Sequence, residues 1–162
     1  MDEKDLLELL SGQNQIQRVM ETNQKTEKFG LVLTKEDAKA LVERRKENLK
    51  EQQRIEFGEG ILPKLIFTFC DSPYIYQDNY VDTISRLQEI FYLYKNESMD
   101  ELSDDELLDF MKNAFDGECE GSLEYLEETA LEEFARTIRR EGRSFFGQYY
   151  TVKKWRDREH EL

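Results

Sequence analysis

Apolar residues recur every three or four positions along most of this chain, which is the spacing of amphipathic α-helices. The clearest example is the segment 79–95. A shorter and more apolar helix is expected over 61–70, where Pro63 suits a first helical turn. We expect these two helices to form the buried centre of the fold. The apolar positions of the longer helix are Tyr80, Ile84, Leu87, Phe91 and Tyr94.

Three Ser and Thr residues stand where the N-caps of further helices are expected, namely Thr34, Ser103 and Ser122. The first begins a charged helix over 35–55, whose thin apolar stripe includes Ile55. Ser103 opens the run Ser-Asp-Asp-Glu, which has the form of a capping box. The second and third caps therefore predict two more amphipathic helices towards the C-terminus.

Residues 2–28 form a further segment with helical spacing, and Ser11–Gly12 in its interior offers a break into two helices. The rest of the segment is rich in Gln, Asn and Lys. Two alternatives stay open for its N-terminal part, which is either loose in a monomer or used to pair with a second copy as a homodimer. Its apolar positions are Leu6, Leu9, Leu10, Ile16, Val19 and Met20.

Together these elements predict an all-α fold, an irregular bundle of five to seven helices in one domain. A very small two-stranded element formed by Leu31–Leu33 and Tyr149–Val152 is an alternative addition. The domain spans residues 1–162 and has three parts: an N-terminal helical segment (1–28), a helical core (29–142) and a basic aromatic tail (143–162).

The net charge of −13 comes from one stretch of the chain. Segment 97–133 holds 15 Asp and Glu against one basic residue, whereas segment 136–158 holds eight Arg and Lys against two acids. The acidic stretch disfavours nucleic acid by repulsion. It suits a basic protein partner, which we expect to meet Asp104, Asp105 and Asp109. The alternative is that the basic residues downstream dock against the chain's own acids.

The stretch from Asp116 to Glu127 matches the EF-hand calcium loop, with acids at positions 1, 3, 5, 9 and 12 and Gly at position 6. Its side-chain ligands would be Asp116, Glu118, Glu120 and Glu127. Glu at positions 3 and 5 is one methylene longer than the usual Asp or Asn, and no second loop of this kind appears. A capped acidic turn between two helices is the simpler interpretation. A loop that responds to calcium or magnesium is the alternative.

The chain offers little for catalysis. Its only histidine, His160, lies two residues before the C-terminal Leu162, and no nucleophile motif or phosphate-binding glycine loop appears. A carboxylate–metal enzyme built on Asp71, Asp78 and Asp82 is an alternative, although such residues are more often helix caps. We therefore expect no cofactor and favour a non-enzymatic, acidic protein-binding or regulatory module.

The sequence lacks three features that would indicate a membrane or secreted protein. No apolar run approaches 18 residues, so no membrane span is expected. The first residues, Met1–Asp5, are acidic and unlike a signal peptide. Cys70 and Cys119 stand far apart without a CxxC motif, which favours free thiols. We expect a cytoplasmic protein without a membrane partner.

Five stretches of the chain carry a resemblance to a known family. They are Arg54–Ile66, Phe69–Ile75, Leu87–Glu97, Phe115–Gly117 and Gly121–Leu123. Together they resemble an uncharacterised bacterial family, a domain of unknown function found in Clostridia-type Firmicutes. The resemblance covers about 29–140. It implies a bacterial, cytoplasmic origin and a single domain, and it brings no activity, cofactor or catalytic residue.

Overall fold

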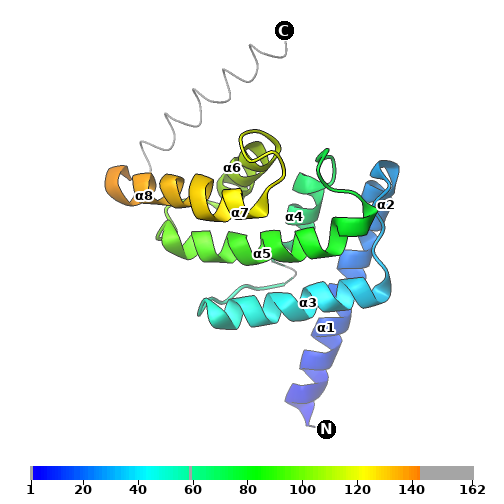
Figure 1. Ribbon diagram of the computed structural model, residues 1–162. Helices are drawn as coiled ribbons and strands as arrows, with labels where there is room; N and C mark the ends of the chain where they lie inside the picture. The colour runs from blue at the N-terminus through cyan, green and yellow to red at the C-terminus, as the bar shows by residue number, and fades with distance from the viewer. Residues whose placement is uncertain (1, 59, 143–162) are drawn as a thin grey trace. The chain divides into compact units, whose positions relative to one another are not determined.

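The computed structural model describes residues 2–58 and 60–142, and all the regular structure in these two ranges is helical (Figure 1). The prediction of an all-α fold is therefore confirmed. The chain folds into two compact units, residues 1–92 and 93–162. The boundary between them lies inside the helix Tyr80–Glu97. That the chain is a single domain stays a prediction, and the basic aromatic tail, 143–162, lies outside the described residues.

Six helices of eight residues or more are present in the described chain, within the expected range of five to seven. They are α1 (Glu3–Glu21), α3 (Lys35–Glu51), α4 (Leu62–Phe69), α5 (Tyr80–Glu97), α6 (Asp104–Asp116) and α8 (Leu131–Glu141). The shorter elements are α2 (Asn23–Thr26), α7 (Leu123–Tyr125), the 3₁₀ turns η1 (Glu27–Phe29) and η2 (Gln77–Asn79), and the π-helical turn η3 (Leu126–Ala130).

Capping boxes begin α3 and α6. The Thr34 hydroxyl accepts a hydrogen bond from the backbone N–H of Asp37 at 3.1 Å, and the Asp37 carboxylate accepts one from the N–H of Thr34 at 3.0 Å. Ser103 and Glu106 repeat this exchange at 3.2 and 2.9 Å. Each cap satisfies N–H groups that a first helical turn leaves unpaired, which stabilises the helix by about 1 kcal/mol. Both caps were expected from the sequence, and both are confirmed.

The expected break at Ser11–Gly12 is wrong, because α1 is continuous across it. A glycine inside a helix costs about 1 kcal/mol relative to alanine, and the packing of α1 along α3 offsets that cost. A Cβ on Gly12 would lie 3.8 Å from Nζ of Lys46, so this glycine stands where α1 faces α3. The helix ends instead at Glu21, and the hydroxyl of its C-cap residue Thr22 donates to the Val19 carbonyl at 2.6 Å.

The prediction for the end of α3 is also wrong, because the helix ends at Glu51 and does not reach Ile55. Gln53 adopts a left-handed conformation with φ of +55°, and the backbone N–H of Arg54 donates to the Leu49 carbonyl at 2.8 Å. This is the Schellman arrangement that closes many helices. Ile55 therefore leaves the apolar stripe and is 84% exposed.

The segment Leu31–Leu33 is extended and belongs to no strand in the described chain. The Asn23 side-chain amide accepts from the N–H of Leu33 at 2.8 Å and donates to its carbonyl at 2.9 Å. Gln77 makes the same pair of bonds with Val32, both at 2.9 Å. Two side-chain amides thus supply the hydrogen bonds that a neighbouring strand would make. The strand expected to pair here lies outside the described residues.

The buried centre of unit 1 lies where the sequence predicts it, on α4 and the first part of α5. Each fully buried aliphatic or aromatic side chain there stabilises the fold by about 1.5–3 kcal/mol. In unit 2 the rings of Phe110 on α6 and Phe134 on α8 stack with centroids 3.7 Å apart. The buried residues of α4 and α5 include Leu62, Leu65, Ile66, Phe69, Ile84, Leu87 and Phe91.

Both cysteines, Cys70 and Cys119, are within the described chain and buried, and neither forms a disulfide. Searching the described helices for a membrane span finds none that combines enough length with enough apolar character.

Candidate functional site

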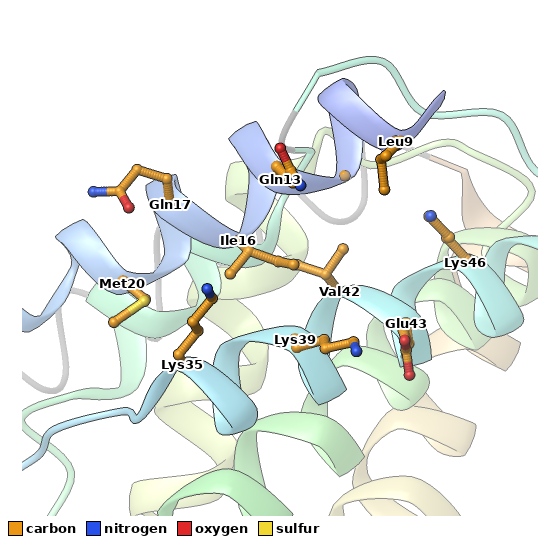
Figure 2. A pocket seen from close by; sticks show the side chains of 11 residues that line it. Leu9, Gln13, Ile16, Gln17, Met20, Lys35, Lys39, Val42, Glu43 and Lys46 are labelled. Atoms are coloured by element: carbon orange, nitrogen blue, oxygen red, sulfur yellow. The ribbon is translucent and has the colours of Figure 1, made fainter. Parts of the chain in front are cut away.

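A groove of about 790 Å³ lies between α1 and α3 in unit 1 (Figure 2). The two helices run antiparallel along it, so that Met20 and Lys35 mark one end and Leu9 and Lys46 the other. In Figure 2 the side chains of Ile16 and Val42 point toward one another across the groove. The floor of the groove is therefore apolar, and its rim carries charged side chains.

Both walls of the groove carry the residue spacing of a coiled coil. On α1 the lining positions alternate by four, three and four residues: Leu9, Gln13, Ile16 and Met20. On α3 they repeat the same spacing: Lys35, Lys39, Val42 and Lys46. In coiled coils, side chains at this spacing form a stripe that faces a neighbouring helix. Leu6 extends the stripe of α1 by one position towards the N-terminus. Such walls suit the packing of a further amphipathic helix.

The rim of the groove is positively charged. Lys35, Lys39 and Lys46 line it against one acid, Glu43, and all four residues are exposed. Within the described chain none of the three lysines forms an ion pair. In a protein with a net charge of −13, three lysines that form no ion pair with any described side chain make the charge around this apolar groove locally positive. This favours an acidic ligand, because opposite charges attract across the rim.

The first turns of α1 present leucines to solvent. Asp2 caps the helix, since its carboxylate accepts from the backbone N–H of Asp5 at 2.9 Å. Acidic residues in this first turn also interact favourably with the helix dipole. Four leucines nearby are about half exposed or more, which is unusual for a continuous apolar set. Their exposed fractions are 47% for Leu6, 61% for Leu7, 48% for Leu9 and 48% for Leu10.

A buried ion pair anchors the loop between α3 and α4 in the same unit. Nε of Arg45 donates to Oε1 of Glu56 at 2.8 Å, and the two side chains are 4% and 17% exposed. The hydroxyl of Tyr92 donates to the same carboxylate. Burial, and after it the negative charge of Glu56, raises the pKa of Tyr92, which keeps its hydroxyl protonated as a donor. With Glu56 held inward, the neighbouring Ile55 and Phe57 are 84% and 88% exposed.

Sequence reasoning did not find this ion pair. Arg45 lies in a helix dense with charged residues, and nothing in the local pattern points to a partner eleven positions later. The only local signal is a lone Glu56 between two apolar residues, followed by Gly58 and Gly60. A Cβ on Gly60 would lie 1.7 Å from Oε1 of Glu56, so this position requires glycine for close approach as well as for its φ of +62°.

The three acids expected to meet a basic partner lie on the first turns of α6 in unit 2. Asp104 is 2.9 Å from Nζ of Lys95, so its charge is already partly neutralised inside the unit. Asp105 and Asp109 are exposed and stand one helical turn apart on the same helix. The structure thus brings two of the three together on one face of α6.

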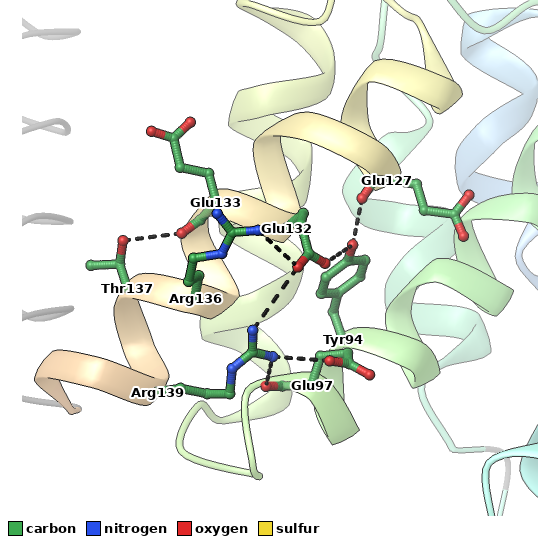
Figure 3. Close-up of polar contacts among 8 residues, drawn as sticks. All are labelled: Tyr94, Glu97, Glu127, Glu132, Glu133, Arg136, Thr137 and Arg139. Carbon is green, nitrogen blue, oxygen red and sulfur yellow. Dashed lines mark hydrogen bonds and ion pairs between the residues drawn. The ribbon is translucent and has the colours of Figure 1, made fainter.

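An ion-pair network neutralises another part of the acidic segment (Figure 3). Arg139 lies 2.9 Å from the Glu97 carboxylate and 4.0 Å from that of Glu132. Arg136 lies 3.6 Å from Glu132. Both arginines belong to the basic segment downstream, so the chain does dock some of its basic residues against its own acids. Residues 93–162 still hold 19 acids against ten bases, so unit 2 keeps a net charge of −9.

Tyr94 supports the π-helical turn at the start of this network. Hydrogen bonds in a π-helix skip one residue more than in an α-helix, which displaces carbonyls from their usual partners. The Tyr94 hydroxyl donates to the backbone carbonyl of Glu127 and lies 3.4 Å from the Glu132 carboxylate (Figure 3). Burial, and after it the charge of Glu132, raises the pKa of Tyr94.

The four predicted calcium ligands lie on and around the turn between α6 and α7: Asp116, Glu118, Glu120 and Glu127. Asp116 is 2.7 Å from Nζ of Lys112. Backbone hydrogen bonds close the turn, with Glu120 left-handed at φ of +48° and the N–H of Gly121 donating to the Phe115 carbonyl at 2.8 Å. Across residues 2–58 and 60–142 no three His, Cys, Asp or Glu side chains are grouped to hold a metal. Divalent-cation binding at this loop stays a prediction.

A model of a family of unknown function (DUF6323) matches residues 18–144. The match includes all of α3 and the last residues of α1. No curated protein and no solved structure matches the chain. The resemblance to an uncharacterised family is therefore confirmed, and the bacterial origin that it implies stays a prediction.

Proposed function

The chain belongs to the DUF6323 family, which brings no activity with it, and from this premise we propose that it is a protein-binding module. Its recognition surface is the groove between α1 and α3. Its partner is an amphipathic helix that carries acidic residues beside an apolar stripe. The observation that carries the proposal is the coiled-coil spacing of both groove walls beneath three lysines that have no ion-pair partner among the described side chains.

The two parts of the groove have different roles in binding. Leucine-like side chains of a partner helix would pack onto the floor formed by Ile16 and Val42, and each such leucine would contribute about 1.5–3 kcal/mol when fully buried. The rim lysines add specificity and association rate more than affinity, because charges at an exposed rim are screened by water and salt. Helix-in-groove recognition of this kind uses anchors at positions i, i+3, i+4 and i+7 of the bound helix.

Two synthetic helical peptides test the proposal directly. Both carry leucines at coiled-coil spacing, and one has Glu while the other has Lys at the flanking positions. We expect fluorescence anisotropy to show binding of the acidic peptide only. Replacing Lys39 and Lys46 by Glu should weaken it at least about tenfold, because like charges then face each other. Lys50→Glu is the matched control, since Lys50 is exposed on the same helix outside the groove.

The proposal fails if the acidic peptide does not bind, or if both peptides bind equally well. It also fails if Lys50→Glu weakens binding as much as the groove variants, because the effect would then reflect net charge alone.

A basic partner for α6 is a second candidate, favoured by the exposure of Asp105 and Asp109 on one helix face. A lysine-rich peptide should bind the chain at low salt, and reversing both aspartates to Lys should weaken that binding. Asp82→Lys, on an exposed position of α5, is the control for each single reversal, because it changes the net charge by the same amount. Equal loss in the control would leave only a general effect of net charge.

A further inference from the structure

The partner helix itself can be identified from the chemistry of the chain. We propose that the groove between α1 and α3 receives the N-terminal half of α1 from a second copy of the same chain. This inference rests on the proposed function and names its occupant. The groove needs a helix with an apolar stripe and acidic flanks, and the first turns of α1 meet both requirements.

The apolar requirement is met by the stripe that α1 already carries. Leu6 and Leu9 are 47% and 48% exposed, so they are available to a second molecule. Leu7 and Leu10 widen the apolar surface and are 61% and 48% exposed. In Figure 1 these first turns, in dark blue, project below α3. A helix that projects with a leucine stripe is suited to packing against a groove of the same spacing.

Charge determines the direction of packing. Asp2, Glu3 and Asp5 make the N-terminus of α1 acidic. If the α1 helices of two copies ran antiparallel, this acidic end would lie at the Met20 and Lys35 end of the other copy's groove. If they ran parallel, the two acidic ends would meet each other. Opposite charges attract and like charges in an interface repel, so the antiparallel arrangement is favoured.

The spacing of the stripe also determines the register. Its central position is Gln13, with Leu6 seven residues before it and Met20 seven residues after it. In an antiparallel pair with a two-fold axis at Gln13, each Leu6 lies beside Met20 of the second copy. The two Gln13 amides meet at the axis, where each can donate to the other. A polar residue in an otherwise apolar stripe commonly specifies register in this way.

Two-fold symmetry makes the exchange reciprocal. Each copy presents its own α1 and receives the α1 of the other copy, so one kind of contact occurs twice. Such an interface is closed, which gives a dimer and not a growing chain of molecules.

Sedimentation equilibrium of the full chain tests the association. We expect a mass twice the 19.4 kDa of one chain. Leu6→Lys should raise the dissociation constant by about a hundredfold or more, because two leucine contacts are lost per dimer. Leu6 is half exposed, so this change should leave the helical circular dichroism signal intact. A single-chain mass up to about 100 μM would overturn the inference.

Cysteine cross-linking tests the register. Gln13→Cys should form an intermolecular disulfide rapidly under mild oxidation, because the two copies of this position meet at the axis. Asn14→Cys is the matched control, on the next residue and equally exposed but turned away from the stripe. The native Cys70 and Cys119 are buried and should not compete. Equal cross-linking at both positions would overturn the predicted register.

A charge swap tests the antiparallel direction. Lys35→Glu should weaken the dimer about tenfold, and adding Asp5→Lys to the same chain should restore it. Both residues lie in first helical turns and are exposed. If Asp5→Lys deepens the loss, the two side chains do not face each other and the direction is wrong.

The results separate this inference from the proposed function. If the acidic synthetic peptide binds the groove while the chain stays monomeric, the groove is a helix-binding site for another protein and the second-copy inference falls. If the chain is a dimer that neither Leu6→Lys nor the acidic peptide dissociates, the dimer forms elsewhere and the inference falls as well. Dissociation of the dimer by excess acidic peptide is the result expected if both proposals hold.

Discussion

Removing the carboxylate of Glu56 should destabilise unit 1 far more than an ordinary surface substitution. Glu56→Ala leaves the guanidinium of Arg45, 4% exposed, without the carboxylate that its Nε contacts at 2.8 Å. It also leaves the Tyr92 hydroxyl without its acceptor. Removing one member of a buried ion pair lowers the free energy of unfolding by about 3–5 kcal/mol, because a buried charge is left uncompensated. We expect a loss in this range for Glu56→Ala.

Replacing the other member of the ion pair, Arg45, should cost less stability. Arg45→Met leaves the Glu56 carboxylate, 17% exposed, with water access and with the Tyr92 hydroxyl as donor. The double variant Arg45→Met, Glu56→Leu removes both charges together and should be more stable than Glu56→Ala alone, since replacing a buried pair by apolar residues is often neutral. This ordering distinguishes an uncompensated charge from simple loss of packing.

Urea unfolding followed by circular dichroism measures these free energies, with the slope against urea checked for constancy. Arg44→Ala is the matched control, one residue away on α3. Its side chain is 29% exposed and pairs with acids at the surface, among them Glu47 at 2.8 Å, so it should cost less than about 1 kcal/mol. A loss for Glu56→Ala no larger than that of Arg44→Ala would refute the reasoning.

Three further changes can be measured by the same unfolding assay. Gly60→Ala places a Cβ 1.7 Å from Oε1 of Glu56 and should destabilise the chain by about 2 kcal/mol or more. The same substitution should cost less in the Glu56→Ala background, where the clashing carboxylate is absent. Equal losses in both backgrounds would argue against the clash. Tyr94→Phe removes the hydroxyl that donates to the Glu127 carbonyl and should cost about 1 kcal/mol; unchanged stability would mean that the π-turn does not need this bond. Burial raises the pKa of Tyr80 to about 12 from its ordinary 10, so the unfolded chain loses this proton first as the pH rises. The free energy of unfolding should therefore fall between about pH 10 and 12, by up to about 1.4 kcal/mol per pH unit for this proton. Tyr80→Phe should make that fall shallower, and an identical pH profile would contradict the assignment.

The helices and their caps could be predicted because they depend on residues close together in the chain. The exchange between Thr34 and Asp37 spans three residues, and so does that between Ser103 and Glu106. The buried faces of α4 and α5 were found for the same reason, since apolar positions three or four apart fall on one side of a helix. The break expected at Ser11–Gly12 was wrong because local propensity is weaker than packing against α3.

The candidate site could be predicted only in part. The leucines of α1 and their spacing are visible in the sequence, and they indicated self-association as one alternative. The lysines of the groove looked like ordinary surface charge, because the antiparallel packing of α1 and α3 alone gathers Lys35, Lys39 and Lys46 around one apolar floor.

By itself, the sequence determined which segments are helical, where most of them begin and which of their faces are apolar, because these properties depend on contacts within a few residues. Only the tertiary structure decided which charges meet. Arg45 and Glu56 are eleven positions apart, and Glu97 and Arg139 are 42 apart. Such pairings carry no periodic signal, since they follow from how helices pack and where loops return.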